Sequence, residues 1–241
     1  MATSRQAYAA AVIVAAGKGE RFGDGGKVLA MAADRPLLAW SLDAFANAAS
    51  IRDIVIVAGE HTEEPIRELV VAEGWPGVST IVLGGASRHE SVARGIAAVD
   101  ALHEVVLVHD AARPLIEAAH IDAAADAARD RGAAILATPV ADTIKRVEGD
   151  AILETVPRSS LWAAQTPQAF RLEAYQALLR DLTDGHGDFT DDASIFEAFG
   201  KAVAIVPGSR LNLKVTHPED LDLVDALLRA RLHTTLTKGT R

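Results

Sequence analysis

Cysteine is absent from the 241-residue sequence, which excludes disulfide bonds and thiolate metal sites. Its absence fits a reducing cytosol, and residues 1–10 lack the apolar core of a secretory signal, so we expect a cytoplasmic location. Long apolar runs are missing as well. None approaches the roughly 20 residues that cross a bilayer, so we expect no membrane partner.

Basic residues are in the minority. The chain has 24 Lys and Arg against 33 Asp and Glu, a net charge of -9, which opposes general binding to nucleic acid or to an anionic membrane. A phosphorylated ligand must therefore meet a local basic cluster. The length and the 49% hydrophobic content suit a single domain over residues 1–241 with a sizeable core.

Short β-branched runs alternate with amphipathic stretches along the chain. This order predicts an α/β fold of three layers, with a mostly parallel, Rossmann-like sheet flanked by helices. The expected strands are 11–15, 54–58, 79–83, 105–109, 134–139 and 202–206. The expected helices are 37–49, 63–72, 90–102, 118–131, 172–182, 191–199 and 218–231, and residues 234–241 are expected to be disordered.

The alternation breaks at residues 140–158. Two strand-like segments, 143–147 and 151–156, flank Glu148-Gly149-Asp150, which is typical of a turn. We expect a protruding β-hairpin arm inserted in the domain. Because the arm is too short and too polar to hold a core of its own, we expect it to pack against another surface, and a second subunit is one candidate.

A glycine-rich basic loop follows the first strand, beginning Ala15-Ala16-Gly17-Lys18-Gly19-Glu20-Arg21. Small residues allow backbone N–H groups to approach a phosphate or a base, while Lys18, Arg21 and Lys27 supply charge to a triphosphate. A dinucleotide fingerprint would need Gly at position 22, which is Phe, and the loop does not match a Walker A motif either. The loop therefore indicates an anion site and disfavours an NAD-dependent oxidoreductase, although a plain glycine-rich connection remains the alternative.

Two further motifs lie after strands. Gly84-Gly85-Ala86-Ser87-Arg88-His89-Glu90-Ser91 opens a helix whose first N–H groups could bind a base or a phosphate, or could simply be capped by Ser87. His109-Asp110-Ala111-Ala112-Arg113 places an acid and an Arg where open α/β sheets bind ligands. Asp110 suits a metal-bound water or a substrate hydroxyl, or an internal ion pair with Arg113.

Together with Gln165-Thr166-Pro167, Thr190-Asp191-Asp192 and Asn212-Leu213-Lys214, these motifs resemble the 2-C-methyl-D-erythritol 4-phosphate cytidylyltransferases of the sugar-nucleotidyltransferase superfamily. The resemblance covers nearly the whole chain. It implies transfer of CMP from CTP to 2-C-methyl-D-erythritol 4-phosphate in the non-mevalonate isoprenoid pathway. The products would be 4-diphosphocytidyl-2-C-methyl-D-erythritol and pyrophosphate, and the cofactor would be Mg²⁺.

The resemblance also implies residue roles. The nucleotide would be bound by Ala15, Ala16, Gly17, Gly19, Gly85 and Ser91. Catalysis would fall to Arg21, Lys27, Arg158 and Lys214. The acceptor would be bound by Asp110, Arg113, Thr143, Thr166 and Thr190, with Asp110 near Mg²⁺ directly or through a water. Because Thr143 and Arg158 lie on the arm and would enter the neighbouring site, a homodimer is the expected working unit.

Each residue also has an ordinary interpretation: Arg158 as a surface side chain, Thr190 as a helix cap and Lys214 as a solvated strand residue. Two other functions stay open. A ribitol 5-phosphate cytidylyltransferase would share most nucleotide-binding positions. A nucleotide-binding regulatory protein without turnover would keep the fold, but the full set of charged residues argues for an enzyme. The sequence departs from the family at Ala86, Gly25-Gly26 and Leu211.

Overall fold

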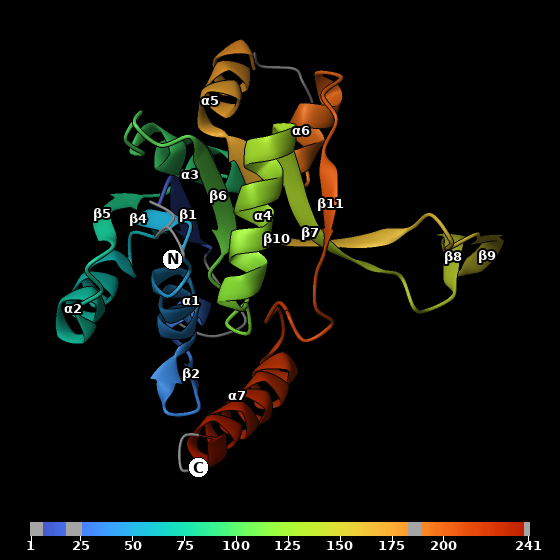
Figure 1. Cartoon of the computed structure of the whole chain (residues 1–241). Helices are drawn as coiled ribbons and strands as arrows, with labels where there is room; N and C mark the ends of the chain where they lie inside the picture. Colours follow the sequence, from blue (N-terminus) through green and yellow to red (C-terminus); the bar gives the residue numbers. More distant parts are fainter. Residues whose placement is uncertain (1–6, 18–25, 183–188, 239–241) are drawn as a thin grey trace.

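The computed structural model describes residues 7–17, 26–182 and 189–238. Its main sheet has seven strands in the order β11-β7-β10-β6-β1-β4-β5 (Figure 1). All run parallel except β10, which lies antiparallel between β6 and β7. The mostly parallel sheet is therefore confirmed. The strands are β1 (Ala9–Ala15), β4 (Ile51–Ala58), β5 (Val78–Leu83), β6 (Val105–Asp110), β7 (Ala133–Pro139), β10 (Trp162–Arg171) and β11 (Ala204–Pro207).

Helices cover both faces of the sheet and make the expected three layers. The helices are α1 (Leu37–Ala46), α2 (Glu63–Glu73), α3 (Arg88–Ala97), α4 (Ala118–Arg131), α5 (Leu172–Asp181), α6 (Asp192–Ala198) and α7 (Pro218–Lys238). Alternate residues of β1 point to opposite cores because a strand has a period of two. Ala11 and Ile13 pack with residues of α1, α2 and α4, whereas Ala10 and Val12 pack with residues of α3, α5 and α6.

Strand β10 is the main element that the sequence did not predict. Pro167 lies in its middle, and proline in a central strand removes a hydrogen-bond donor. The pairing with β7 accordingly shifts register between Ala164 and Gln168, around the cis Thr166–Pro167 bond. Thr166 is buried beside the end of β6.

The protruding hairpin forms as expected, with β8 (Ile144–Glu148) paired antiparallel to β9 (Ala151–Val156) and extending away from the sheet (Figure 1). A second small hairpin, β2 (Met31–Ala32) with β3 (Arg35–Pro36), follows a short 3-10 helix, η2 (Lys27–Leu29). It turns through Ala33 and Asp34, both at positive φ, and the sequence did not predict it.

Helix α7 packs beside the β2–β3 hairpin, where Val224 and Leu228 join a small core with Ala32 and Leu37. The helix continues to Lys238, so the expected disorder from Thr234 is wrong for residues 234–238. A helix that has already formed extends by one backbone hydrogen bond per residue and needs no apolar pattern to do so. The polar sequence of residues 234–238 therefore does not prevent them from being helical. Among the described residues, none of the helices has the length and apolar character needed to span a membrane.

Candidate active site at the carboxyl edge of the sheet

Three strand ends bring the predicted nucleotide loops together. Val14 pairs in register with Asp110, and the N–H of Ala111 donates to the Val14 carbonyl at 3.1 Å. On the other side of β1, the N–H of Gly84 donates to the carbonyl of Ala58 at 2.8 Å. A Cβ at Gly84 would collide with the side chain of Ala16. Glycine therefore allows the loops after β1 and β5 to touch.

The loop before α3 is held by its own side chains. The N–H of Gly85 donates to Ser91 Oγ at 3.0 Å, and that hydroxyl donates to the Ser87 carbonyl at 2.9 Å. Ser87 Oγ caps the helix by accepting from the N–H of Glu90 at 3.1 Å, as one interpretation of the sequence expected. The Glu90 carboxylate also accepts from the N–H of Ala86 at 2.5 Å. The loop is therefore shaped before any ligand arrives.

Asp110 lies at the end of β6 inside a group of cations. Its Oδ2 is 2.7 Å from Lys214 Nζ and 3.9 Å from Arg113 Nε, and its Oδ1 is 3.5 Å from Arg88 Nη2. Burial raises the pKa of this carboxyl, but attraction to Lys214 and Arg88 outweighs burial and lowers the pKa to about 2. Asp110 is therefore ionised near neutral pH. Its pair with Arg113 exists, but is the longest of the three.

The side chain of Thr166 contacts the backbone of Asp110. Its Oγ1 accepts from the backbone N–H of Asp110 at 3.0 Å and lies 3.0 Å from Nδ1 of His109. Complete burial lowers the pKa of His109 to about 3, so its ring is neutral near pH 7. In the tautomer that carries its proton on Nε2, His109 accepts the Thr166 hydroxyl hydrogen at Nδ1. The Thr166 hydroxyl therefore helps to fix the backbone at Asp110.

Thr190 stands at the entrance to α6 and is exposed. The helix is capped by Asp191, whose carboxylate accepts from the N–H of Ser194 at 3.0 Å, so the interpretation of Thr190 as the cap is wrong. Gln168 on β10 anchors this end of α6. Its Oε1 accepts from the N–H groups of Asp192 and Ala193, each at 3.0 Å.

The structure gives a partial view of the remaining nucleotide residues. Ala15 is buried and Gly17 is exposed at the end of β1, and Lys27 opens η2 directly after Gly26, whose φ is 70°. Gly19 and Arg21 lie outside the described residues. The predicted roles of these residues stay predictions.

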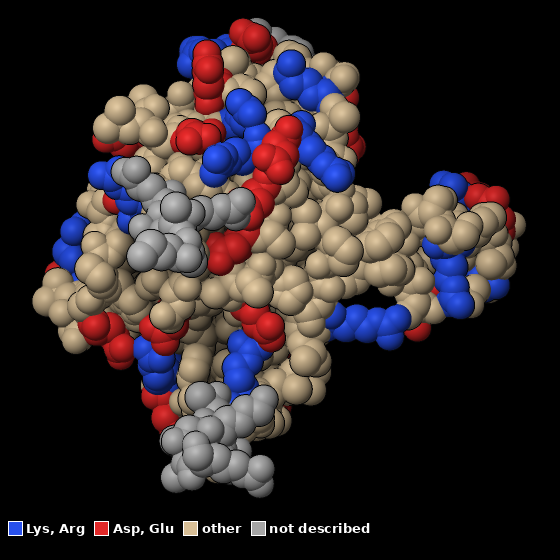
Figure 2. Space-filling view, in the orientation of Figure 1, with Lys and Arg blue, Asp and Glu red and all other residues tan. Residues whose placement is uncertain are grey.

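Thr143 and Arg158 lie at the base of the arm, and both are exposed. The Arg158 guanidinium donates to the carbonyl of Ala141. No hydrogen bond or ion pair joins either residue to Asp110 in the described part of the chain. Figure 2 shows Lys and Arg side chains near the tip of the arm, away from the body of the molecule, and others at its base. One chain alone therefore does not bring the arm residues to the Asp110 cluster.

Several residues around Asp110 were not assigned roles from the sequence. Arg88 contacts both Asp110 and the buried Asp192, and Arg113 Nη1 donates to the Asn212 carbonyl at 2.9 Å. The Nδ2 group of Asn212 donates to the carbonyl of Thr166 at 2.9 Å. Arg88 and Asn212 both lie within motifs named above. A polar side chain inside such a motif, with no role of its own assigned, was the sequence signal that pointed to each of them.

The fit of a divalent metal can be tested from the side chains present. Within the described residues, no group of three or more His, Asp and Glu side chains is placed to hold a metal ion. Both oxygens of Asp110 already face cations. These residues do not form a resident metal site, because a further cation at Asp110 would be repelled by Lys214 and the two arginines.

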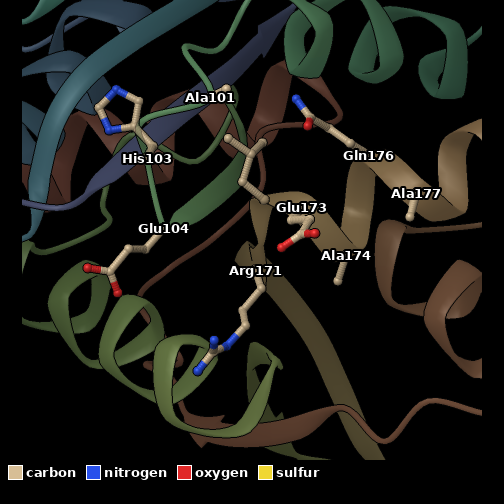
Figure 3. A pocket seen from close by; sticks show the side chains of 9 residues that line it. Ala101, His103, Glu104, Arg171, Glu173, Ala174, Gln176 and Ala177 are labelled. Carbon is tan, nitrogen blue, oxygen red and sulfur yellow. The ribbon is translucent and has the colours of Figure 1, made fainter.

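A separate cavity of about 570 Å³ opens at the opposite edge of the sheet (Figure 3). Its lining includes His103 and Glu104, which precede β6, together with Arg171 at the end of β10 and Glu173 on α5. None of the predicted site residues lines it. The candidate site is therefore the Asp110 cluster and the loops beside it.

Comparisons with known proteins identify the family of the chain. The family model described as IspD: 2-C-methyl-D-erythritol 4-phosphate cytidylyltransferase matches residues 9–230. The enzyme of that name from Prochlorococcus marinus is 43% identical over 91% of this chain and 98% of its own length. The one from Bacillus velezensis is 41% identical over 91% and 95%.

The solved structures that resemble this chain carry names of the same family. The 4-diphosphocytidyl-2C-methyl-D-erythritol synthase of Anaerococcus prevotii superposes with a TM-score of 0.82 at 29% identity, covering 93% of this chain and 99% of that one. The Thermus thermophilus 2-C-methyl-D-erythritol 4-phosphate cytidylyltransferase superposes with a TM-score of 0.76 at 33% identity, covering 90% and 98%. The chain therefore belongs to the IspD family of 2-C-methyl-D-erythritol 4-phosphate cytidylyltransferases.

Proposed function

We propose that the Asp110 edge of the sheet transfers CMP from CTP to the phosphate of 2-C-methyl-D-erythritol 4-phosphate and releases pyrophosphate. The chain is a cytidylyltransferase of the non-mevalonate isoprenoid pathway, in keeping with its family. The observation that carries the residue-level proposal is the buried carboxylate of Asp110 held by Lys214, Arg88 and Arg113 beside two nucleotide-type loops. In a chain of net charge -9, this is the kind of local basic cluster that a phosphate ligand needs.

The nucleotide would occupy the loops after β1 and β5. Backbone groups at Ala15, Ala16 and Gly17, with Gly19 beyond the described residues, would follow the phosphates. Gly85 and Ser91 would recognise the base, since Ser91 Oγ already shapes that loop. Lys27 and Arg21 would neutralise charge that develops on the triphosphate.

The acceptor would lie over Asp110. Lys214 and Arg113 would hold its phosphate and Asp110 would accept a hydrogen bond from one of its hydroxyl groups, with Thr190 at the rim. The acceptor phosphate is already an anionic nucleophile near neutral pH, so no strong base is required. One of its oxygens would attack the α-phosphorus of CTP in line, forming a P–O bond while the bond to the β-phosphate oxygen breaks. Pyrophosphate carries away the electron pair.

A Mg²⁺ ion would arrive with the triphosphate as part of the substrate. Magnesium in proteins is commonly held by substrate phosphates with few protein ligands, and the cations around Asp110 leave room for at most a water-mediated contact. Its contribution when bound would be neutralisation of phosphate charge.

The arm would complete the site of a second copy of this chain. The side chains of Val147, Ile152 and Leu153 on the arm are 56%, 63% and 56% exposed, an unusual set of apolar groups for a hairpin with no core. A homodimer would bury them and would bring Thr143 and Arg158 to the partner's acceptor phosphate. The chain would then be one domain, 1–241, with the arm as its dimerisation element. The cytoplasmic location stays a prediction from the sequence.

The test is pyrophosphate release with CTP and Mg²⁺, with 2-C-methyl-D-erythritol 4-phosphate and ribitol 5-phosphate supplied separately at equal concentration. We expect a clear preference for the former. A preference for ribitol 5-phosphate would keep the chemistry but refute the proposed acceptor. Binding of CTP without turnover of either acceptor would instead support the regulatory alternative.

A further inference from the structure

Arg88 connects two carboxylates that lie on different elements. It stands in the first turn of α3, and its Nη2 is 2.8 Å from Oδ2 of Asp192 and 3.5 Å from Oδ1 of Asp110. Asp192 opens α6 and Asp110 ends β6, so one guanidinium joins three elements around the site. Burial lowers the pKa of Arg88, but attraction to Asp192 and Asp110 outweighs it and raises the pKa. Arg88 therefore stays charged.

The Asp192 end of this bridge is rigid. Its carboxylate is only 1% exposed, and its Oδ1 accepts from the Tyr175 hydroxyl at 2.5 Å. Its backbone N–H donates to Gln168 on β10. Asp192 is thus anchored to α5 and β10 independently of Arg88. A guanidinium held against so fixed a carboxylate loses little further entropy on reaching a second one.

The Asp110 end is asymmetric. Lys214 and Arg113 both approach Oδ2, whereas Arg88 is the cation that approaches Oδ1 in the described part of the chain. Contacts on one oxygen alone leave rotation about the Cβ–Cγ bond poorly restrained, because terminal sp³–sp² torsions have broad minima. The contact from Arg88 to Oδ1 restrains the plane of the carboxylate.

We propose that Arg88 is a positioning residue for the transfer reaction, which holds the Asp110 carboxylate in the orientation that receives the acceptor, using buried Asp192 as its fixed support. This inference rests on the proposed function of the Asp110 edge. If Arg88 were only a structural counter-ion of Asp192, its one role would be to neutralise that buried charge.

A pair of substitutions distinguishes these roles. Arg88→Gln alone leaves Asp192 buried and unpaired, which destabilises a protein strongly, so stability and activity would fall together. Arg88→Gln with Asp192→Asn replaces the buried ion pair by a neutral pair of similar shape. We expect this double variant to recover the unfolding temperature of the wild type while kcat stays lower by about 10- to 100-fold, the usual cost of losing an orienting contact.

Three further variants complete the design. Asp192→Asn alone keeps Arg88 in the chain but weakens its fixed support, so we expect its kcat to lie between those of the wild type and the double variant. Arg88→Lys keeps the charge without the guanidinium fork and should retain more activity than Arg88→Gln. Arg67→Gln, which removes an exposed pair with Glu63 on α2, is the matched control and should change neither kcat nor stability appreciably.

Recovery of wild-type kcat by the stable double variant would overturn the inference, since Arg88 would then only neutralise Asp192. A rise in the KM for CTP at unchanged kcat would also overturn it, by assigning Arg88 to triphosphate binding. Absence of turnover by the wild type with both acceptors would reject the proposed function itself and the inference with it. Wild-type turnover therefore reports on the function, and the ratios between variants report on Arg88.

Discussion

At the scale of single residues, the charged side chains around Asp110 determine its ionisation state. Asp110 is buried, which alone would favour its protonated form, but Lys214 and the two arginines keep it ionised. His109 directly before it is fully buried, and burial outweighs the attraction of Asp110 and lowers its pKa, so its ring is neutral near pH 7. Asp110 is thus charged and His109 neutral although both are buried. The difference arises from the side chains that tertiary packing places around each of them.

The depressed pKa of Asp110 predicts an acid-sensitive contribution to stability. Its native pKa of about 2 is below the usual 3.8, so the stabilisation is present above pH 3.8 and is lost as the pH falls through 2. Between pH 5 and pH 2, the free energy of unfolding in urea should fall by about 2 kcal/mol more in the wild type than in Asp110→Asn. Equal pH dependence in the two would contradict the ion-pair assignment.

At the scale of elements, close packing of α3 on the sheet fixes the loop that precedes it. Gly95 faces β1 and β4, where a Cβ would collide with Val12 and would lie 2.8 Å from Cγ2 of Val57. The absence of a side chain lets the helix axis approach the strands. Because α3 begins directly after the Gly84–Ser87 loop, its depth on the sheet also sets the position of Gly85 and Ser91.

The sign of the change in the free energy of unfolding caused by Gly95→Ala tests this packing. In an unobstructed helix, alanine would stabilise by up to about 1 kcal/mol because its backbone loses less entropy than glycine. Here we expect a loss of roughly 1 to 3 kcal/mol in the free energy of unfolding, because overpacking must push α3 off the strands. Urea denaturation measures the difference. A stabilised variant would show that the sheet accommodates the methyl group, and the proposed dependence of the loop on helix depth would fail.

At the scale of the whole molecule, the proposed dimer requires that each site take Arg158 from the partner's arm and Lys214 from its own chain. Arg158→Ala and Lys214→Ala should then each abolish most activity as homodimers. In a mixed dimer, one site receives both defects and the other receives neither.

Mixing these two inactive variants under conditions that allow subunit exchange should therefore restore activity to about a quarter of the wild-type value, because half of the dimers are mixed and each has one intact site. Pyrophosphate release before and after exchange measures the recovery. The matched control mixes Arg158→Ala with Arg158→Ala/Lys214→Ala, in which no site can be intact. No recovery in the first mixture, with mixed dimers demonstrated by native mass spectrometry, would place Arg158 outside the partner's site.

The sequence by itself determined the layered fold, the parallel strands and the arm, because these follow from the spacing of apolar residues and from turn residues that are close together in the chain. It also located Asp110, Arg113, Thr166 and Lys214 in recognisable motifs, and the structure brings these four together. Their roles in catalysis stay predictions.

Only the tertiary structure decided how these residues are held. Strand β10 contains Pro167 and lacks a period of two, so its insertion between β6 and β7 depends on partners more than 20 residues away. The support of Asp110 by Thr166, and its bridge through Arg88 to Asp192, depend on the same insertion. Local patterns report which face of an element is apolar, whereas the contacts of a buried polar group are set by elements that are distant in sequence and meet only in the folded chain.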